Sequence, residues 1–322
     1  MHQEAIKGIT SADDAAIPAT PTAAVPEHLR GFVRENRLAR PSTAATTARL
    51  ALVVAAWVVI ASAGLRADRW FVWAPVWVAL AFLTATPLAL MHEAVHHNLF
   101  GSRAVNHAVG TVAAACLFFH GPAYRAWHLT HHAYTFAPED SEQLPDQFSS
   151  RLHYLGYCLV LGPAFAVVLW AGAVATALGR PPAWVGTRRL QQHVRRWAVA
   201  PLLVLAAVGV LVARAPVLVL ELWLIPAVLG SLVVFPLLTM PEHFQGKGRN
   251  GLLHNTRTTV SNRVVRAVYW NNNFHTAHHL VPTVPPQGLP LLDAQIASGN
   301  TLRASGFLTF HRDVLQDLRP TT

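Results

Sequence analysis

Charged residues are scarce in this sequence. Asp, Glu, Lys and Arg together make up only 13% of the 322 residues, whereas 52% are hydrophobic. A soluble domain usually carries about 25% charged residues. The shortage of charge therefore excludes an ordinary soluble globular protein and indicates an integral membrane protein.

Cysteine is scarce too, and basic tracts with interleaved aromatic residues are missing. Cys116 and Cys158 both lie in apolar stretches, which favours buried hydrophobic side chains over a disulfide or a metal site. The net charge of +9 comes without any Lys/Arg tract that alternates with aromatic residues, so we exclude a nucleic-acid partner. On a membrane protein this positive charge reports orientation instead.

The N-terminal segment lacks the apolar core of a signal peptide. Residues 1–26 are rich in Ala, Thr and Pro, and we expect them to be disordered. We divide the chain into a disordered or cytosolic N-terminal segment, 1–45, a membrane domain, 46–300, and a C-terminal tail, 301–322.

Long uncharged apolar stretches are what the sequence has in abundance. Five of them cover residues 50–64, 70–91, 155–178, 197–213 and 216–240. A membrane-spanning helix needs about 17–25 residues, so the stretches predict an all-α integral membrane fold. A sixth stretch, 108–119, is too short to cross comfortably, and we interpret it as a re-entrant or interfacial helix.

The basic residues predict the topology, because Lys and Arg accumulate on the cytoplasmic side. They cluster before residue 50, between 179 and 197, and after residue 246. One hairpin then comprises 50–64 and 70–91, and a second comprises 197–213 and 216–240. The stretch 155–178 begins and ends on the cytoplasmic side and carries Gly162-Pro163, a plausible helix break. We expect it to dip into the membrane or lie along it, which leaves four spans, with both termini cytoplasmic.

Histidine is abundant, and half of the eighteen histidines form a pattern. These nine are His92, His96, His128, His131, His132, His243, His275, His278 and His279. Helix positions i, i+3 and i+4 lie on one face, so each group can direct two or three imidazoles at one centre. Imidazole is a good ligand for iron, zinc, copper and nickel. Nine ligands exceed the about six positions of one octahedral ion, so the pattern predicts two metal ions.

A divalent-metal transporter is the alternative from another functional class. Histidine-rich loops of that kind are low-complexity segments, and transporters place their ligands near the bilayer midplane. Here the histidines lie at the predicted cytoplasmic ends of the spans, which favours an enzyme.

The motifs HxxxH, HxxHH and HxxHH, in this order around two hydrophobic hairpins, resemble those of the membrane fatty acid desaturase superfamily. That superfamily also contains alkane hydroxylases, carotenoid ketolases and hydroxylases, and sphingolipid desaturases. The segment NNNFHTAHHLVPTVPPQGLP is similar to the third histidine box of bacterial acyl-lipid desaturases, and RAWHLTHHAYTFAPEDSE to the second. The resemblance covers about residues 50–295.

The resemblance implies two non-haem irons, O₂ as oxidant, electrons from a separate donor such as a ferredoxin, and all nine histidines as iron ligands. His243 matches the isolated histidine before the third box. The first box is one residue shorter than in animal-type acyl-CoA desaturases, which disfavours an acyl-CoA substrate. We therefore expect a fatty acyl-lipid desaturase of a bacterial inner membrane, with its histidine boxes on the cytoplasmic side. The alternative on the same scaffold is a hydroxylase or ketolase of an alkane, a carotenoid or a specialised acyl chain.

Metal-bound histidines usually donate their other N–H to a carboxylate, a carbonyl or a water molecule. The candidates for this outer role are Glu93, Asp140, Glu242, Asn272 and Asn273. For Asn273 a contact to metal-bound water and a plain loop hydrogen bond are both open. Tyr124, Arg125 and Trp127 flank the second box, where they either contact a polar head group or anchor the chain at the interface. No four-cysteine cluster and no Rossmann glycine pattern is present, so the electron donor is a separate protein.

Overall fold

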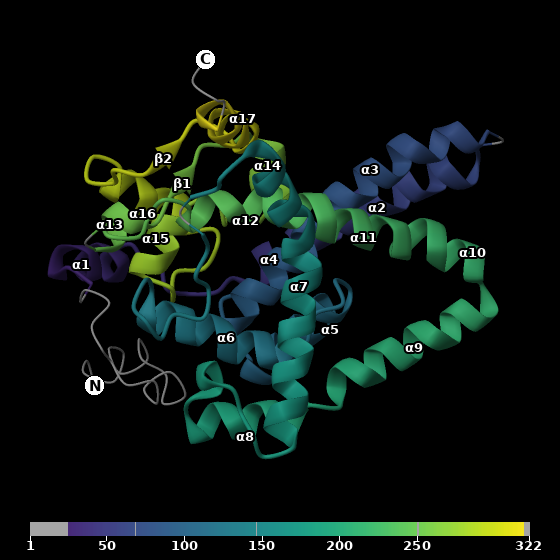
Figure 1. Ribbon diagram of the computed structural model, residues 1–322, viewed down its shortest axis with the longest axis horizontal. Coiled ribbons are helices and arrows are strands. Elements are labelled where there is room, and N and C mark those ends of the chain that lie inside the picture. The colour runs from purple at the N-terminus through teal and green to yellow at the C-terminus, as the bar shows by residue number, and fades with distance from the viewer. Residues whose placement is uncertain (1–24, 68, 146, 250, 319–322) are drawn as a thin grey trace.

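The computed structural model describes residues 25–67, 69–145, 147–249 and 251–318, and helices dominate it (Figure 1). The expected disorder of residues 1–26 falls almost entirely outside these ranges. The α-helices are α1 (Glu27–Glu35), α2 (Thr43–Leu65), α3 (Trp73–Leu83), α4 (Ala85–Val95), α5 (Arg103–Ala115), α6 (Gly121–Tyr134), α7 (Arg151–Ala177), α8 (Arg188–Trp197), α9 (Ala200–Arg214), α10 (Pro216–Val219), α11 (Ile225–Leu229), α12 (Phe235–His243), α13 (Leu252–Asn255), α14 (Arg263–Val268), α15 (His275–Leu280), α16 (Leu289–Ile296) and α17 (Phe307–Asp317). Short 3₁₀ turns cover Trp70–Val72 and Ala183–Val185. Two strands that the sequence did not predict, β1 (Thr258–Thr259) and β2 (Arg303–Ala304), pair in parallel.

Polar side chains define where several helices begin. The hydroxyls of Ser42 and Ser150 accept hydrogen bonds from backbone N–H groups in the first turns of α2 and α7, at 3.2 and 3.1 Å. His120 does the same for α6, where its Nδ1 accepts from the N–H of Ala123 at 3.1 Å and Pro122 occupies the first turn. Such caps satisfy N–H groups that have no partner within the helix. The cap at His120 thus sets the start of the helix that carries the second histidine box.

Within the described ranges, five helical segments are long and apolar enough to cross a membrane, one more than the four expected. They are Thr43–Leu65, Trp73–Val95, Arg151–Ala177, Arg188–Arg214 and Pro216–His243. The apolar windows of the first and fourth are only 11% and 6% buried inside the protein. Large aliphatic side chains such as Val59 and Leu203 are exposed there. A lipid environment explains this exposure, because soluble proteins rarely carry apolar surface on this scale.

The additional segment is α7, and one detail of its prediction was wrong. Gly162 and Pro163 do not break the helix, which runs without interruption from Arg151 to Ala177. Gly162 packs closely on another segment, since a Cβ at this position would lie 2.3 Å from the carbonyl oxygen of Ser231. The Gly-Pro pair therefore marks a close helix contact.

The direction of α7 bears on whether it spans. In Figure 1, α2, α3, α9 and α11 extend toward the right, whereas α7 runs from top to bottom across them. A helix that crosses the spanning hairpins in this way fits the expectation that it lies along the membrane. Its length and composition also allow a crossing, so the four-span topology stays a prediction.

The last long segment contains two π-helical stretches, Leu220–Leu224 and Gly230–Val234. Pro226 follows the first stretch and Pro236 follows the second. Proline lacks an N–H group and clashes with the carbonyl four residues earlier. A π-helical stretch widens the helix at such a point, and these stretches often occur at functional sites.

A cap of short elements covers the end of the helices opposite the α2–α3 turn (Figure 1). Leu29 and Val33 of α1 pack in one buried cluster with Leu280, Leu289 and Leu292. Phe310 and Val314 of α17 pack with Met240 and Phe244 in another cluster. Parts of the segments placed outside the membrane domain, 1–45 and 301–322, thus pack against the cap and α12.

The cap offers a direct test of this packing. Leu292 is fully buried, whereas Leu291 beside it on α16 is 45% exposed. We expect Leu292→Ala to lower the free energy of unfolding by about 2–5 kcal/mol, because it leaves a cavity in the cluster. Leu291→Ala is expected to change it by less than about 0.5 kcal/mol. Thermal unfolding of the detergent-solubilised variants measures the difference, and equal losses would contradict this placement of α16.

Candidate metal centre

Nine histidines from four separate elements meet in the interior. His92 and His96 lie at the end of α4, the second box lies on α6, His243 ends α12, and the third box lies on α15. They form two groups, the first made of His92, His96, His128, His132 and His278, and the second of His131, His243, His275 and His279. Within each group the candidate ligand atoms lie within 4.8 Å of one another. All nine predicted ligands thus fall into two clusters that are able to hold metal ions.

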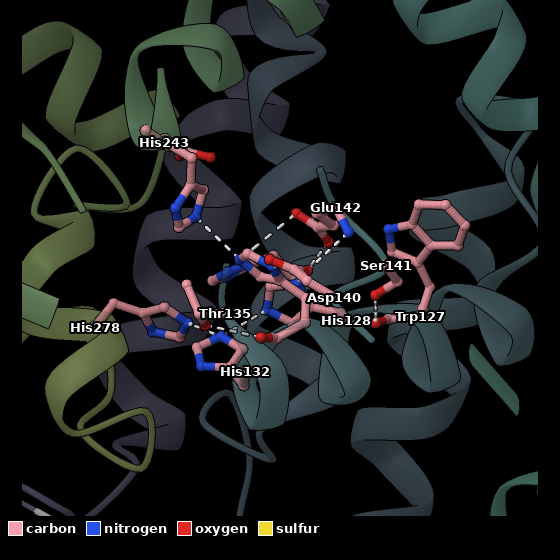
Figure 2. Close-up of polar contacts among 12 residues, drawn as sticks. Trp127, His128, His132, Thr135, Asp140, Ser141, Glu142, His243 and His278 are labelled. Atoms are coloured by element: carbon pink, nitrogen blue, oxygen red, sulfur yellow. Dashed lines mark hydrogen bonds and ion pairs between the residues drawn. The ribbon is translucent and has the colours of Figure 1, made fainter. Parts of the chain in front are cut away.

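In the first cluster the Nε2 atoms point toward one another. Nε2 of His128 lies 3.1 Å from Nε2 of His96 and 3.0 Å from Nε2 of His132. Nε2 of His278 lies 3.1 Å from Nε2 of His132, so α15 closes the cluster from the side opposite α6. Figure 2 shows His128, His132 and His278 converging in this way.

The second cluster has the same character. Nε2 of His243 lies 3.0 Å from Nε2 of His131 and 2.8 Å from Nε2 of His275. The rings of His132 and His279 stack with centroids 4.1 Å apart. Because these two rings belong to different clusters, the two candidate metal sites are immediate neighbours.

Carboxylates approach the outer Nδ1 atoms of four of the histidines. The pairs are His92 with Glu93 at 2.9 Å, His128 with Glu142 at 3.2 Å, His131 with Asp140 at 2.8 Å, and His275 with Glu242 at 3.5 Å. In the first three pairs the carboxylate accepts the N–H, so it fixes the ring proton on Nδ1 and leaves Nε2 with a free lone pair. Facing Nε2 lone pairs repel one another unless a cation lies between them. The structure therefore fits metal ions on an observation independent of the motif.

Unpartnered buried nitrogens support the same conclusion. Among the described residues, Nε2 of His92 and both ring nitrogens of His279 are buried and have no hydrogen-bond partner. A buried polar atom without a partner costs about 1–3 kcal/mol. Metal coordination would satisfy these nitrogens, and their imidazole chemistry suits iron as well as zinc, copper or nickel.

Burial keeps most of the cluster histidines neutral, as metal binding requires. It lowers the pKa values of His96, His128, His132, His275, His278 and His279 well below the ordinary value for histidine. His131 differs. Burial by itself would lower its pKa, but Glu142 and Asp140 beside it raise the pKa to about 9. The negative charge of Asp140 and Glu142 thus lies beside His131, where it favours either a proton or a metal cation on the ring.

Asp140 organises the loop after the second box. Its carboxylate accepts hydrogen bonds from the backbone N–H groups of Phe136 and Glu142, at 2.7 and 2.9 Å, as well as the contact to His131. Burial raises the pKa of Asp140, but His131 outweighs this effect and holds the pKa below its usual value. The carboxylate is therefore ionised and fixes both the loop and the ring of His131.

Glu142 is the site residue that the sequence analysis missed. It lies in the same acidic stretch as Asp140, and its carboxylate contacts Nδ1 of His128 (Figure 2). The signal was present, because three acidic residues, Glu139, Asp140 and Glu142, fall within four consecutive positions after the second box. The sequence alone did not show that this loop folds back over α6.

The three asparagines before the third box have different surroundings. Nδ2 of Asn273 donates to the carbonyl of Thr259 at 2.9 Å. This is a loop hydrogen bond, one of the two roles considered for Asn273. Asn272 lines a cavity together with Glu242 and His275. Asn271 donates to the carbonyl of Pro286 at 2.7 Å. The outer role predicted for Asn272 and Asn273 stays a prediction, and Asn272 is the one that faces open space.

A cavity of about 290 Å³, which we call the site cavity, adjoins both clusters. One end is lined by four histidines, His92, His128, His243 and His275, and its walls come from α6, α7 and α12. Phe165, Val168 and Phe235 make the far part apolar, and Ser141 and Gln143 add polar groups at another edge. The cavity suits an apolar chain that passes close to the clusters.

The residues that flank the second box take separate places. Tyr124 and Trp127 line the site cavity, and Tyr124 stacks on His128 with ring centroids 5.3 Å apart. The guanidinium of Arg125 instead donates to the backbone carbonyl of Val95. Arg125 therefore holds the end of α4 in place beneath His96, while the two aromatic residues shape the cavity.

The other histidines that the structure describes lie outside both clusters. His97 follows a cluster residue directly, but its ring packs against His107 at 5.0 Å between centroids. His120 caps α6, and Tyr154 contacts His311 through its hydroxyl at 2.5 Å. The two cysteines are free and partly buried, in agreement with their interpretation as packing residues.

Comparison with known protein families places the site in a wider context. The sequence model of a family described as fatty acid desaturase matches residues 68–309, which is more than half of the chain and includes all nine clustered histidines. No curated protein matches the chain.

Proposed function

The chain belongs to the fatty acid desaturase family, and on that premise we propose that it is an integral-membrane di-iron enzyme that uses O₂ to introduce a double bond into a fatty acyl chain of a lipid. Membership of the family makes the protein an oxidoreductase. The observation that carries the proposal is the pair of buried histidine clusters at the end of an apolar cavity.

Two irons are the proposed cofactors. The five histidines of the first cluster would hold one iron, and the four of the second would hold the other. When bound, the irons supply the O₂-dependent chemistry that removes hydrogen from an unactivated C–H bond. Side-chain acids and bases cannot cleave such a bond. The protein contributes ligand orientation through Glu93, Asp140 and Glu142, and it excludes water from the site.

The site cavity supports an alkyl substrate. Apart from Thr239 and Glu242 near the clusters, its lining on α7 and α12 is mainly apolar, so this wall holds a chain chiefly by apolar contact. Val160, Ala164 and Val168 of α7 line the cavity and are also exposed on the surface of the protein. Since α7 faces lipid in this proposal, an acyl chain enters sideways from the membrane and need not pass through water.

The polar edge of the cavity supports a substrate with a head group. Gln143 lies beside Ser141, whose hydroxyl donates to the carbonyl of Trp127 at 2.6 Å. A head group at this edge would place the chain along the clusters toward Phe235. Electrons are proposed to come from a separate acidic ferredoxin, attracted to the basic surface of α8.

A hydroxylase or ketolase on the same scaffold is the second candidate. The same cavity would hold an alkane or a carotenoid, and a small difference in how a C–H bond meets the clusters separates a double bond from a hydroxyl group. A metal transporter fits less well, because the cavity beside the clusters is apolar and family membership indicates an oxidoreductase.

The test is a lipid profile by mass spectrometry. The protein is expressed in a bacterial host that supplies a ferredoxin and its reductase, with and without O₂. We expect an O₂-dependent lipid species two hydrogens lighter than its precursor, absent from cells that express His278→Ala. A species heavier by one oxygen would show that the enzyme is a hydroxylase and not a desaturase. Metal uptake without any O₂-dependent product, including after a screen of alkanes and carotenoids, would favour the transporter.

A further inference from the structure

Three spaces lie in a row inside the molecule. The site cavity shares Leu88 and Phe235 with a void of about 10 Å³. That void shares Thr84 and Leu117 with a second cavity of about 560 Å³, which we call the membrane groove. Because each pair of neighbours has lining residues in common, the row leads from the histidine clusters to the groove.

The membrane groove is almost wholly apolar. Its lining comes from α2, α3, α4, α5 and the segment 222–227. None of the lining side chains carries a charge, so the groove suits a hydrocarbon chain.

Phenylalanines close the far end of the site cavity. The rings of Phe119 and Phe235 lie with centroids 5.5 Å apart, and Phe165 contacts both at 5.3 and 5.7 Å. Phe119 is fully buried, and it lines the void together with Leu88 and Phe235. The side chains of Leu88, Phe119 and Phe235 therefore form a stop between the site cavity and the void.

The backbone around the stop is tightly packed. A Cβ at Gly230 would lie 2.3 Å from Oγ1 of Thr84, so the π-helical stretch approaches the α3–α4 junction as closely as glycine permits. From Phe235 to His243 the chain advances eight residues, about 12 Å along a helix. The stop thus lies about two helical turns beyond the clusters, in a wall that has little freedom to move.

We propose that Leu88, Phe119 and Phe235 limit how far an alkyl chain extends past the histidine clusters, and that the membrane groove receives the chain end once this stop is opened. The inference rests on the proposed function, since it concerns the same substrate. The occupant of the groove is the distal end of that substrate, because the row of spaces leads from the clusters to the groove. If a membrane lipid occupied the groove instead, replacing Phe235 would not change the chain-length limit.

The experiment compares acyl substrates of increasing length in wild type, Phe235→Ala and Val233→Ala. Val233 is 52% exposed and lines neither the site cavity, the void nor the groove, so it is the matched control two residues from Phe235. In the wild type we expect kcat/KM to fall by about tenfold or more for each methylene beyond the limit, as at the closed end of an apolar pocket. Phe235→Ala shifts this limit to longer chains, and Val233→Ala leaves it in place.

A second substitution tests the groove itself. Val112 is 49% exposed and lines the groove but not the site cavity. The double variant Phe235→Ala/Val112→Trp is expected to bring the limit back toward the wild-type length by filling the groove. If Phe235→Ala does not fold, Phe235→Leu offers a milder opening of the same stop.

Thermal unfolding without O₂ gives a readout that does not depend on turnover. Chains longer than the wild-type limit are expected to raise the Tm of Phe235→Ala and to leave the Tm of the wild type unchanged. If Phe235→Ala forms product with the same length limit as the wild type, these side chains do not limit chain length, and the proposed function is unaffected. If the wild type forms no product from any acyl chain, the proposed function is refuted. The Tm series still decides whether the stop limits chain length.

Discussion

Replacing His278 by alanine is expected to remove most of the bound iron and to abolish turnover. Nε2 of His278 lies 3.1 Å from Nε2 of His132, and its ring lies 4.3 Å from that of His92 and 4.8 Å from that of His96, centroid to centroid. Loss of this ligand opens the first cluster on the α15 side. We expect iron affinity to fall by more than the about 10–100-fold typical for loss of an outer partner.

The measurement is the iron content of purified protein, about two per chain in the wild type, together with product formation. His254→Ala is the matched control, because His254 lies in the cap, is exposed and belongs to neither cluster. We expect it to keep the iron and the activity of the wild type. Full iron content and full activity in His278→Ala would show that His278 is not a ligand.

Asp140→Asn is expected to have the next largest effect, a loss of about 10–100-fold in iron affinity. The substitution keeps the size of the side chain but removes its charge. Asp140 accepts hydrogen bonds from His131 and from two backbone N–H groups, and a neutral amide oxygen accepts these more weakly. The ring of His131 then loses its fixed orientation and part of the negative charge that favours a cation.

Competition with a chelator measures this loss directly. Glu139→Gln is the matched control, because Glu139 is the exposed neighbour of Asp140 and carries the same charge. It is expected to bind iron as the wild type does. Equal losses of iron affinity in the Asp140 and Glu139 variants would mean that net charge near the site matters and the contact to His131 does not, and wild-type affinity in both would mean that neither matters.

Eight of the nine clustered histidines were predictable because their spacing is a local property, whereas the isolated His243 was matched through the family resemblance. On α6 and α15 the i, i+3 and i+4 positions lie on one face whatever the rest of the chain does. The motif could not assign each histidine to a metal. His131 and His132 are adjacent in the sequence yet belong to different clusters, and each meets partners from α12 or α15.

The outer partners were harder to predict, because they depend on how loops return. Glu93 follows His92 directly, and its contact to that ring needs only local geometry. Glu142 reaches His128 across fourteen residues, because the carboxylate of Asp140 holds the loop between them in place. Sequence alone gave no reason to prefer Glu142 over Asn273, although the structure shows Asn273 bonded to the backbone of Thr259.

The apolar helices show the same division. Composition predicted a membrane protein and the places of the long helices, because exposed apolar surface requires lipid whatever the fold. It overestimated the effect of Gly162 and Pro163, since a proline inside a helix is tolerated when the helix packs closely on a neighbour at that point.

The sequence by itself determined that this protein lies in a membrane and carries histidines on three helical faces fit for metal, because hydropathy and helical spacing are properties of short segments. Only the tertiary structure decided which histidines share a cluster, which carboxylates orient them, and where the site cavity ends. Those features arise where α4, α6, α7, α12 and α15 pack together. Contacts between segments far apart in the chain depend on the packing of all of them, which no single stretch of sequence specifies.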